Sequence, residues 1–338
     1  MGREYDVSGL VQVIRVPQYT NVTVTGTLTA KAWDGQTGGV LAFIASGTVT
    51  LNADIDVSGK GFRGEDRNDA ATFGSATVGW YFNPAEDSSN YKGEGITQFS
   101  DPFRSGRGKL ANGGGGGGNS RTSGGGGGGN GGGGMESSGA GSSDIGGAGG
   151  SALEYSNASD RRKVYLGGAG GCAGREDQER NTSGANGGGI VILQAATMAP
   201  SSHAIKATGS DNTVGDGSTF PDVVMGGGGG GAGGTVLLDV ATISSALQVN
   251  VNGGRGSDTR HNLNCHGPGG GGSGGCVWVS GGSIPVSLSA DVTAGVAGKT
   301  YLPAVVPSSC KSTAYGANDG TNGVTVTNLV LTTGSVPR

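Results

Sequence analysis

The residues that could carry catalysis are sparse in this sequence. Three histidines occur, and none lies near a serine or cysteine in a context typical of a nucleophile. The string Gly295–Thr300 ends like a phosphate-binding loop, but Thr293 stands where that loop needs its first glycine. Pro303 follows at once and argues against the helix that should come next. We therefore expect no nucleotide site and no cofactor.

Carboxylates cluster where Arg175 and Arg180 are interleaved with Glu176, Asp177 and Glu179. A glycosidase needs two carboxyl groups about 5–10 Å apart across a cleft, and spacing along the chain does not set that distance. Mixed charges so close together are typical of a solvated loop. The sequence favours a protein that is not an enzyme.

Four cysteines, Cys172, Cys265, Cys276 and Cys310, allow three pairings that sequence does not distinguish. The spacing around Cys265 and Cys276 lacks the short Cys-x2-4-Cys motif of zinc sites. We expect buried thiols or one or two disulfides, and no metal.

Composition excludes several classes of function. Glycine is 76 of 338 residues, about three times its ordinary share, and only 14% of residues are charged. The net charge is −4 without a basic block, which argues against nucleic-acid binding. No apolar stretch approaches the roughly 18 residues that membrane insertion requires. Residues 1–6 carry mixed charges, so we expect no secretion signal there.

A degenerate repeat organises the chain: a glycine pair opens an apolar run, a turn follows, and a second alternating segment closes on glycine. Four copies span residues 38–59, 188–209, 233–253 and 274–295. Alternation with period two and β-branched residues predict a pair of strands in each copy. No long stretch has a 3.6-residue apolar period, so the predicted fold is all-β with essentially no α-helix.

The long glycine runs, Gly113–Gly118, Gly124–Gly129 and Gly226–Gly231, lie between copies of this repeat. Free glycine tracts are usually flexible linkers. Here each run leaves one β unit and returns to another, which reduces the entropy cost of ordering it. We predict a bundle of polyglycine or polyproline II helices, in which the first two runs are antiparallel neighbours joined by a turn at residues 119–123.

Three segments follow from this organisation. Residues 1–104 form an N-terminal β region that serves as a base for attachment, 105–298 the glycine-rich repeat region, and 299–338 a C-terminal β segment. Within them we expect an irregular surface loop at residues 83–112 and a final strand at 324–331.

The glycine runs and their polar turns, over about residues 106–276, resemble the receptor-binding adhesins that cap the long tail fibres of T-even-type phages. That resemblance implies a sandwich of polyglycine helices whose tip loops bind the bacterial surface. The segments 33–43, 57–64 and 265–270 resemble glycine-rich surface proteins of gliding Bacteroidota, which are secreted and often carry a C-terminal sorting domain. This sequence shows neither a signal peptide nor such a domain, and a virion protein needs neither.

Polar interruptions at the ends of glycine tracts are the candidate receptor contacts, because loops on a rigid scaffold commonly carry recognition. The candidates are Asn119, Ser120, Arg121, Thr122, Ser123, Met135, Glu136, Arg175, Glu176, Asp177, Gln178, Arg180, Arg260 and His261. The alternative is that these residues only turn the chain.

Together these features predict a non-enzymatic virion protein of fibre or spike type, extracellular, that attaches to a host-surface glycan or an outer-membrane protein. Other virion proteins are expected partners, and homo-oligomer formation is left open. The alternatives are a bacterial cell-surface adhesin or secreted filament subunit and, third, an ice-binding protein.

Overall fold

The computed structural model describes residues 12–65, 80, 90–97, 103–116, 122–130, 146–155, 163–174, 180–212, 224–303 and 309–331. No α-helix occurs within these ranges, and the regular secondary structure is β-strand. The predicted near-absence of helix is therefore confirmed for this part of the chain. No helix among these residues is long and apolar enough to cross a bilayer.

Each copy of the repeat supplies two strands joined by a short connection, as predicted. The pairs are β3 (Val40–Leu51) and β4 (Ile55–Asp56), β6 (Ile190–Pro200) and β7 (Ala204–Lys206), β9 (Thr235–Ile243) and β10 (Leu247–Asn250), and β12 (Cys276–Val279) and β13 (Leu288–Asp291). Every copy enters in the same direction, so equivalent strands of successive copies lie parallel.

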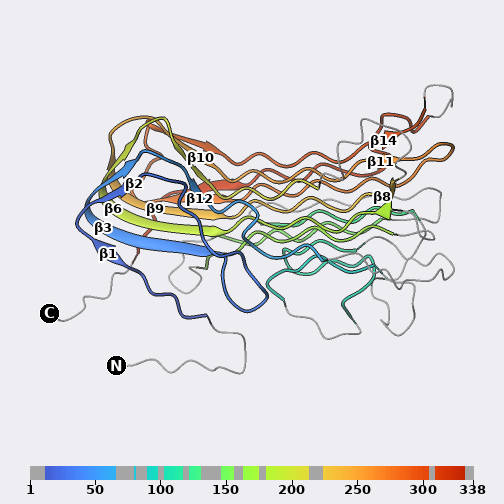
Figure 1. Ribbon diagram of the computed structural model, residues 1–338, viewed down its shortest axis with the longest axis horizontal. Helices are drawn as coiled ribbons and strands as arrows, with labels where there is room; N and C mark the ends of the chain where they lie inside the picture. Colours follow the sequence, from blue (N-terminus) through green and yellow to red (C-terminus); the bar gives the residue numbers. More distant parts are fainter. Residues whose placement is uncertain are drawn as a thin grey trace.

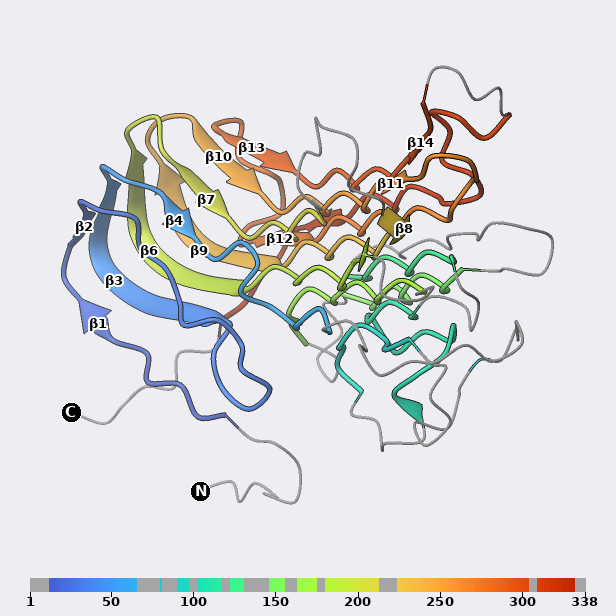
Figure 2. The same ribbon diagram turned by 45° about the vertical axis from the view of Figure 1, so that its right-hand side comes forward.

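Two parallel sheets result, and the views in Figures 1 and 2 place them together at one end of the molecule. The first sheet has the order β1-β3-β6-β9-β12-β15, with β1 at Gln18–Tyr19 and β15 at Val324–Val326, and β2 (Val22–Val24) also pairs with β3. The second sheet has the order β13-β10-β7-β4. Its strands follow those of the first sheet after a tight bend of the chain.

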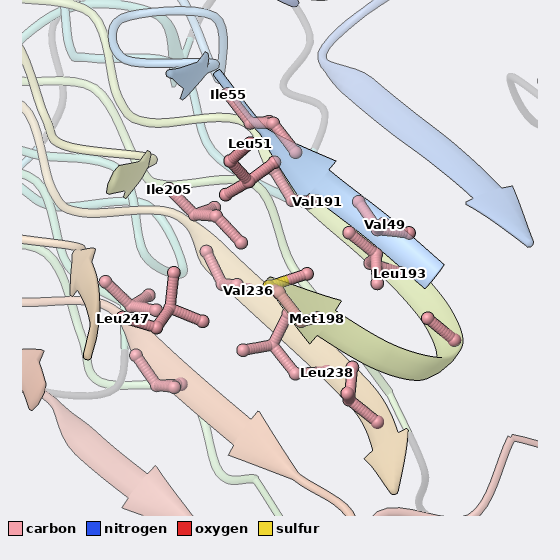
Figure 3. Packing of buried hydrophobic residues seen from close by; sticks show 14 of the residues in the cluster. Val49, Leu51, Ile55, Val191, Leu193, Met198, Ile205, Val236, Leu238 and Leu247 are labelled. Atoms are coloured by element: carbon pink, nitrogen blue, oxygen red, sulfur yellow. The ribbon is translucent and has the colours of Figure 1, made fainter. Parts of the chain in front are cut away.

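The main core lies between these sheets. Val191, Leu193 and Leu238 point inward from the first sheet and meet Ile205 and Leu247 of the second, as Figure 3 shows. Because side chains alternate along a strand, one face of each strand supplies the core. Burying one such aliphatic side chain stabilises the fold by roughly 1.5–3 kcal/mol.

The glycine-rich segments extend from the sheets toward the opposite end of the molecule, where Figure 1 draws them as wavy lines side by side. Their backbones bond laterally with a spacing of three residues. The amides of Gly125 and Gly128 donate to the carbonyls of Gly227 and Gly230, at 2.8 and 3.0 Å. Neighbouring residues within one segment bond to different partners, so each segment is held from several sides.

The prediction that the first two glycine runs are antiparallel neighbours is confirmed for their described residues. Gly126 donates to Gly115 at 2.8 Å and Gly129 to Asn112 at 2.6 Å, which is an antiparallel pairing. Residues 117–121, which include most of the predicted turn, lie outside the described residues.

The loop predicted at 83–112 is irregular in its described residues, but its predicted place on the surface was wrong for several of them, including residues 90–94, Ser105, Arg107 and Asn112. Asn90 and Lys92 are buried, the amide of Gly93 donates to Gly114, and Glu94 accepts from Ala169. A Cβ at Gly93 would collide with the carbonyl oxygen of Ala169, so glycine lets this polar segment enter the bundle. Backbone hydrogen bonds to the bundle bury this segment although it carries charged side chains.

The predicted final strand at 324–331 is shorter than expected. β15 ends at Val326, because Asn328 adopts φ of 60°, a left-handed conformation that breaks an extended strand. The three predicted segments also share one sheet, since β3, β6 and β15 belong to different segments.

Candidate recognition tip

A small sheet closes the far end of the glycine-rich segments, opposite β1 and β3 in Figure 1. Its strands are β5 (Arg180–Asn181), β8 (Val224–Gly226), β11 (Thr259–Arg260) and β14 (Thr300–Tyr301). β11 pairs in parallel with β14 and antiparallel with β8. Thr300, at the end of the string Gly295–Thr300, thus begins a strand and not the helix of a phosphate-binding loop.

Residues 261–266, which we call the tip loop, follow β11 directly. The Nδ1 atom of His261 accepts hydrogen bonds from the amides of Leu263 and Asn264, at 3.1 and 2.8 Å. The imidazole therefore closes a tight turn. Asn262, Leu263 and Asn264 project into solvent, and Leu263 is 71% exposed.

A disulfide and a pair of hydrogen bonds fix the tip loop to the rest of the chain. Cys265 forms a disulfide with Cys310. The carbonyl of His266 accepts hydrogen bonds from the hydroxyls of Thr259 and Thr300, at 2.9 and 3.1 Å. These bonds hold the loop against both β11 and β14, so its exposed turn is presented on a fixed base.

His266 is buried, and its ring lies 4.4 Å from that of His261. Neither ring nitrogen makes a hydrogen bond of normal geometry with the described residues. Burial, with a smaller effect of His261, lowers the pKa of His266 to about 4, while the backbone of Met225 acts in the opposite direction. The histidine is therefore neutral at physiological pH and packs as an apolar ring.

Charged and aromatic groups lie on β11 and β14 and in the residues just before these strands. Arg255 forms an ion pair with Asp258, whose Oδ1 also accepts the amide of Lys299 at 2.7 Å. The guanidinium of Arg260 lies 6.0 Å from the centre of the Tyr301 ring, and both residues are half-buried. A cation over an aromatic face is a modest attraction that also orients the two groups.

The structure sorts the predicted receptor contacts. Arg260 and His261 lie together at the tip. Thr122 and Ser123 are 5% and 0% exposed, and their carbonyls accept bonds from Gly267 and Gly174, so we withdraw them as receptor contacts. Asn119, Ser120, Arg121, Met135, Glu136, Arg175, Glu176, Asp177 and Gln178 lie outside the described residues. Arg180 begins β5, and only its backbone is described.

Leu263 and Asn264 were missed as candidates. The signal was an apolar residue between two asparagines, in a stretch that His261 and Cys265 delimit. The disulfide also had a signal, because Cys265 and Cys310 are 45 residues apart, close to one repeat. The tip thus combines hydrogen-bonding amides, a cation beside an aromatic ring and one exposed aliphatic side chain.

The described residues include no group of three or more His, Cys, Asp or Glu side chains placed to hold a metal ion. The arrangement at the tip suits binding by hydrogen bonds and apolar contact. No protein-family model, curated protein or solved structure matches this chain.

Proposed function

We propose that this chain is a non-enzymatic phage virion protein of fibre or spike type, which presents the tip loop to the host surface. The observation that carries the proposal is the position of that loop. It sits at the far end of the glycine-rich segments, opposite the two sheets, and is anchored by a disulfide and two threonine hydroxyls. The sheets would then serve as the base.

The proposal includes a bundle of polyglycine II helices as the rigid spacer. The three-residue spacing of lateral hydrogen bonds supports it, because a polyproline II type helix has three residues per turn. So does the absence of a left-handed φ in the described parts of the long glycine runs. Such helices have no internal hydrogen bonds, so each buried amide depends on a neighbouring segment for its partner.

Rigidity is what the glycines supply in this proposal. A Cβ at Gly126 would collide with the carbonyl of Ala148, and one at Gly229 with that of Gly126. Without side chains, the segments approach closely enough to bond backbone to backbone. A spacer cross-linked in this way holds the tip at a fixed distance and orientation from the base. A flexible glycine linker does not.

The chemistry of the tip fits a surface glycan or an outer-membrane protein loop. Asn262 and Asn264 offer donors and acceptors, while Leu263 offers apolar contact. Tyrosine and arginine, here Tyr301 and Arg260, are common anchors in recognition surfaces.

A cell-binding assay tests the proposal. Fluorescently labelled full-length protein would be incubated with a panel of bacterial strains, beside a variant with Asn262→Gly, Leu263→Ser and Asn264→Gly. We expect binding to particular strains and a loss of at least tenfold in the variant. Val286→Ser, at a fully exposed residue between β12 and β13, is the control and should bind as the wild type does. Equal binding by the tip variant would refute recognition by this loop.

The same tip would suit a bacterial cell-surface adhesin, so location decides between the two. Gold-labelled antibody against the purified protein should decorate phage particles at a tail or spike. Labelling of bacterial envelopes without labelling of particles would contradict the virion assignment and favour the adhesin.

A further inference from the structure

The outer face of the first sheet is only partly covered. Near the glycine-rich segments, its outward residues Leu237 and Trp278 pack under Leu166 and Leu329. Two residues further along the strands, the face opens into a groove of about 680 Å³. The residues of this sheet groove are Ile44, Ala45, Ser46, Gln194, Ala195, Ala196, Asp239, Val240, Ala241, Ser280, Gly281, Gly282, Ser283 and Pro285.

Among the described residues that line it, the groove has one charged group, the carboxylate of Asp239. Ile44, Gln194 and Asp239 stand side by side in register on β3, β6 and β9. The Nε2 of Gln194 donates to Asp239 Oδ2 at 3.0 Å, which orients the carboxylate. No lysine, arginine or histidine of the described ranges lines the groove. The outward residues of the next row, such as Ala196 and Ala241, are small. The groove therefore fits a slender apolar segment that brings a cation.

The chain itself carries such a segment. Residues 13–16, which we call the arm, precede β1 and read Val-Ile-Arg-Val. Val13 is 91% exposed and Val16 42%, and Arg15 between them is exposed. Arg15 makes no ion pair or side-chain hydrogen bond within the described residues. Val13, Ile14 and Val16 thus form a short exposed apolar strip beside Arg15.

The arm is held at the edge of the first sheet, outside the groove of its own chain. It is tied at one end, where the side chain of Gln12 accepts the amide of Gly38 at 2.7 Å. It is tied at the other end, where Pro17 accepts the amide of Ile44 at 3.0 Å. Both ties hold it along the edge of β3, beside the end of the groove that Ile44 forms.

We propose that two copies of this chain pair by exchanging arms, with the arm of each copy in the sheet groove of the other and Arg15 on Asp239. A two-fold axis requires the same patch on both partners, and here arm and groove adjoin on one patch. Pairing covers Val13 and Val16, and it gives Arg15 and Asp239 each an ion-pair partner. It leaves the tip free and does not depend on what the tip binds.

Sedimentation velocity of the full-length protein, from 0.1 to 50 μM, tests the pairing by charge reversal. We expect a dimer in the wild type. The dissociation constant of the dimer should be at least tenfold larger for Arg15→Glu and for Asp239→Lys. The double variant Arg15→Glu/Asp239→Lys should return to within about threefold of wild type, because close charge pairs couple strongly across interfaces. Asp239→Asn, which keeps an oxygen for Gln194, should weaken pairing by a smaller factor.

Lys109→Glu reverses an exposed charge on the glycine-rich region and should leave the dimer unchanged. Thermal melting of each variant checks that the fold is retained. A wild type that stays monomeric at 50 μM overturns the proposal, and so does a dimer that neither reversal weakens. If both single variants weaken pairing and the double variant does not restore it, Arg15 and Asp239 do not meet and the proposal fails.

Discussion

Glycine is required in the bundle by close approach and not by an unusual backbone conformation. Gly127 has no left-handed φ, yet a Cβ there would collide with the carbonyl of Gly271 on the neighbouring segment. Both groups are backbone, so neither can turn aside as a flexible side chain would. The segments would have to separate, which stretches hydrogen bonds on either side.

Gly127→Ala should therefore destabilise the protein by about 1–3 kcal/mol, the usual cost of overpacking a buried site. Urea unfolding followed by intrinsic fluorescence would measure the loss. Gly26→Ala is the matched control, because a Cβ at Gly26 meets no atom within 4 Å. A stability of Gly127→Ala equal to that of the control would show that the segments are not packed as described.

Asp54 is the carboxylate whose titration should be visible in stability. It accepts hydrogen bonds from Lys206 Nζ at 2.6 Å and from the amide of Ala204 at 2.9 Å. The hydrogen bond from Lys206, and after it that from Ala204, lowers the pKa of Asp54 to about 2. Partial burial of the carboxylate acts in the opposite direction and raises the pKa. Because the pKa is lower in the folded state, the contribution is present above pH 4 and is lost as the pH falls toward 2.

We expect wild type to melt above Asp54→Asn by roughly 1–2 °C at pH 6, the shift that about 1 kcal/mol produces in a chain of this size. The modest figure reflects the partial exposure of the pair. The difference should shrink between pH 4 and pH 2. A gap that stays constant over this range would mean that Asp54 does not titrate below its usual pKa. Glu154→Gln, which removes an exposed carboxylate away from the pair, gives the baseline.

At the scale of elements, a strand could be predicted from the sequence only where its alternating pattern runs over enough residues. The strand pairs of the four copies repeat an alternating pattern over several residues, and they were located correctly. The tip strands have two or three residues each, too short for any periodicity to show. Thr122 and Ser123 were placed on the surface because they are polar, although backbone bonding buries them in the bundle. Polarity predicts exposure only where glycine does not bring other backbones close.

The cysteines give a direct test of how the tip loop is anchored. Cys172 and Cys276 are buried thiols, and burial raises the pKa of each to about 12. A thiol that is neither ionised nor accessible reacts slowly with Ellman's reagent. The native protein should therefore show almost no fast-reacting thiol.

Denaturation without reductant should release two thiols per chain, and denaturation with reductant four, because Cys265 and Cys310 are disulfide-bonded. Four thiols without reductant would contradict the disulfide. The double variant Cys265→Ser/Cys310→Ser should show two under both denaturing conditions, which assigns the change to this pair.

At the scale of the whole molecule, backbone hydrogen bonds join the three segments that were predicted from the sequence. The first sheet takes β3 from residues 1–104, β6 from 105–298 and β15 from 299–338. Which copies become neighbours was not predicted, because stacking depends on where each glycine-rich excursion returns to the sheets. The insertion that carries the longest glycine runs is equally embedded, since Gly125 and Gly128 bond to two other segments of the bundle.

This embedding predicts that sheets and bundle unfold together. The bundle has few side chains to bury, so its backbone bonds persist only while the sheets hold the ends of its segments in place. Differential scanning calorimetry should show one transition with calorimetric and van't Hoff enthalpies that agree, as for a two-state unit. Gly127→Ala should lower that single transition, although the substitution lies far from the sheet core. Two separate transitions, with only the lower one moved by Gly127→Ala, would mean instead that the bundle melts while the sheets remain folded.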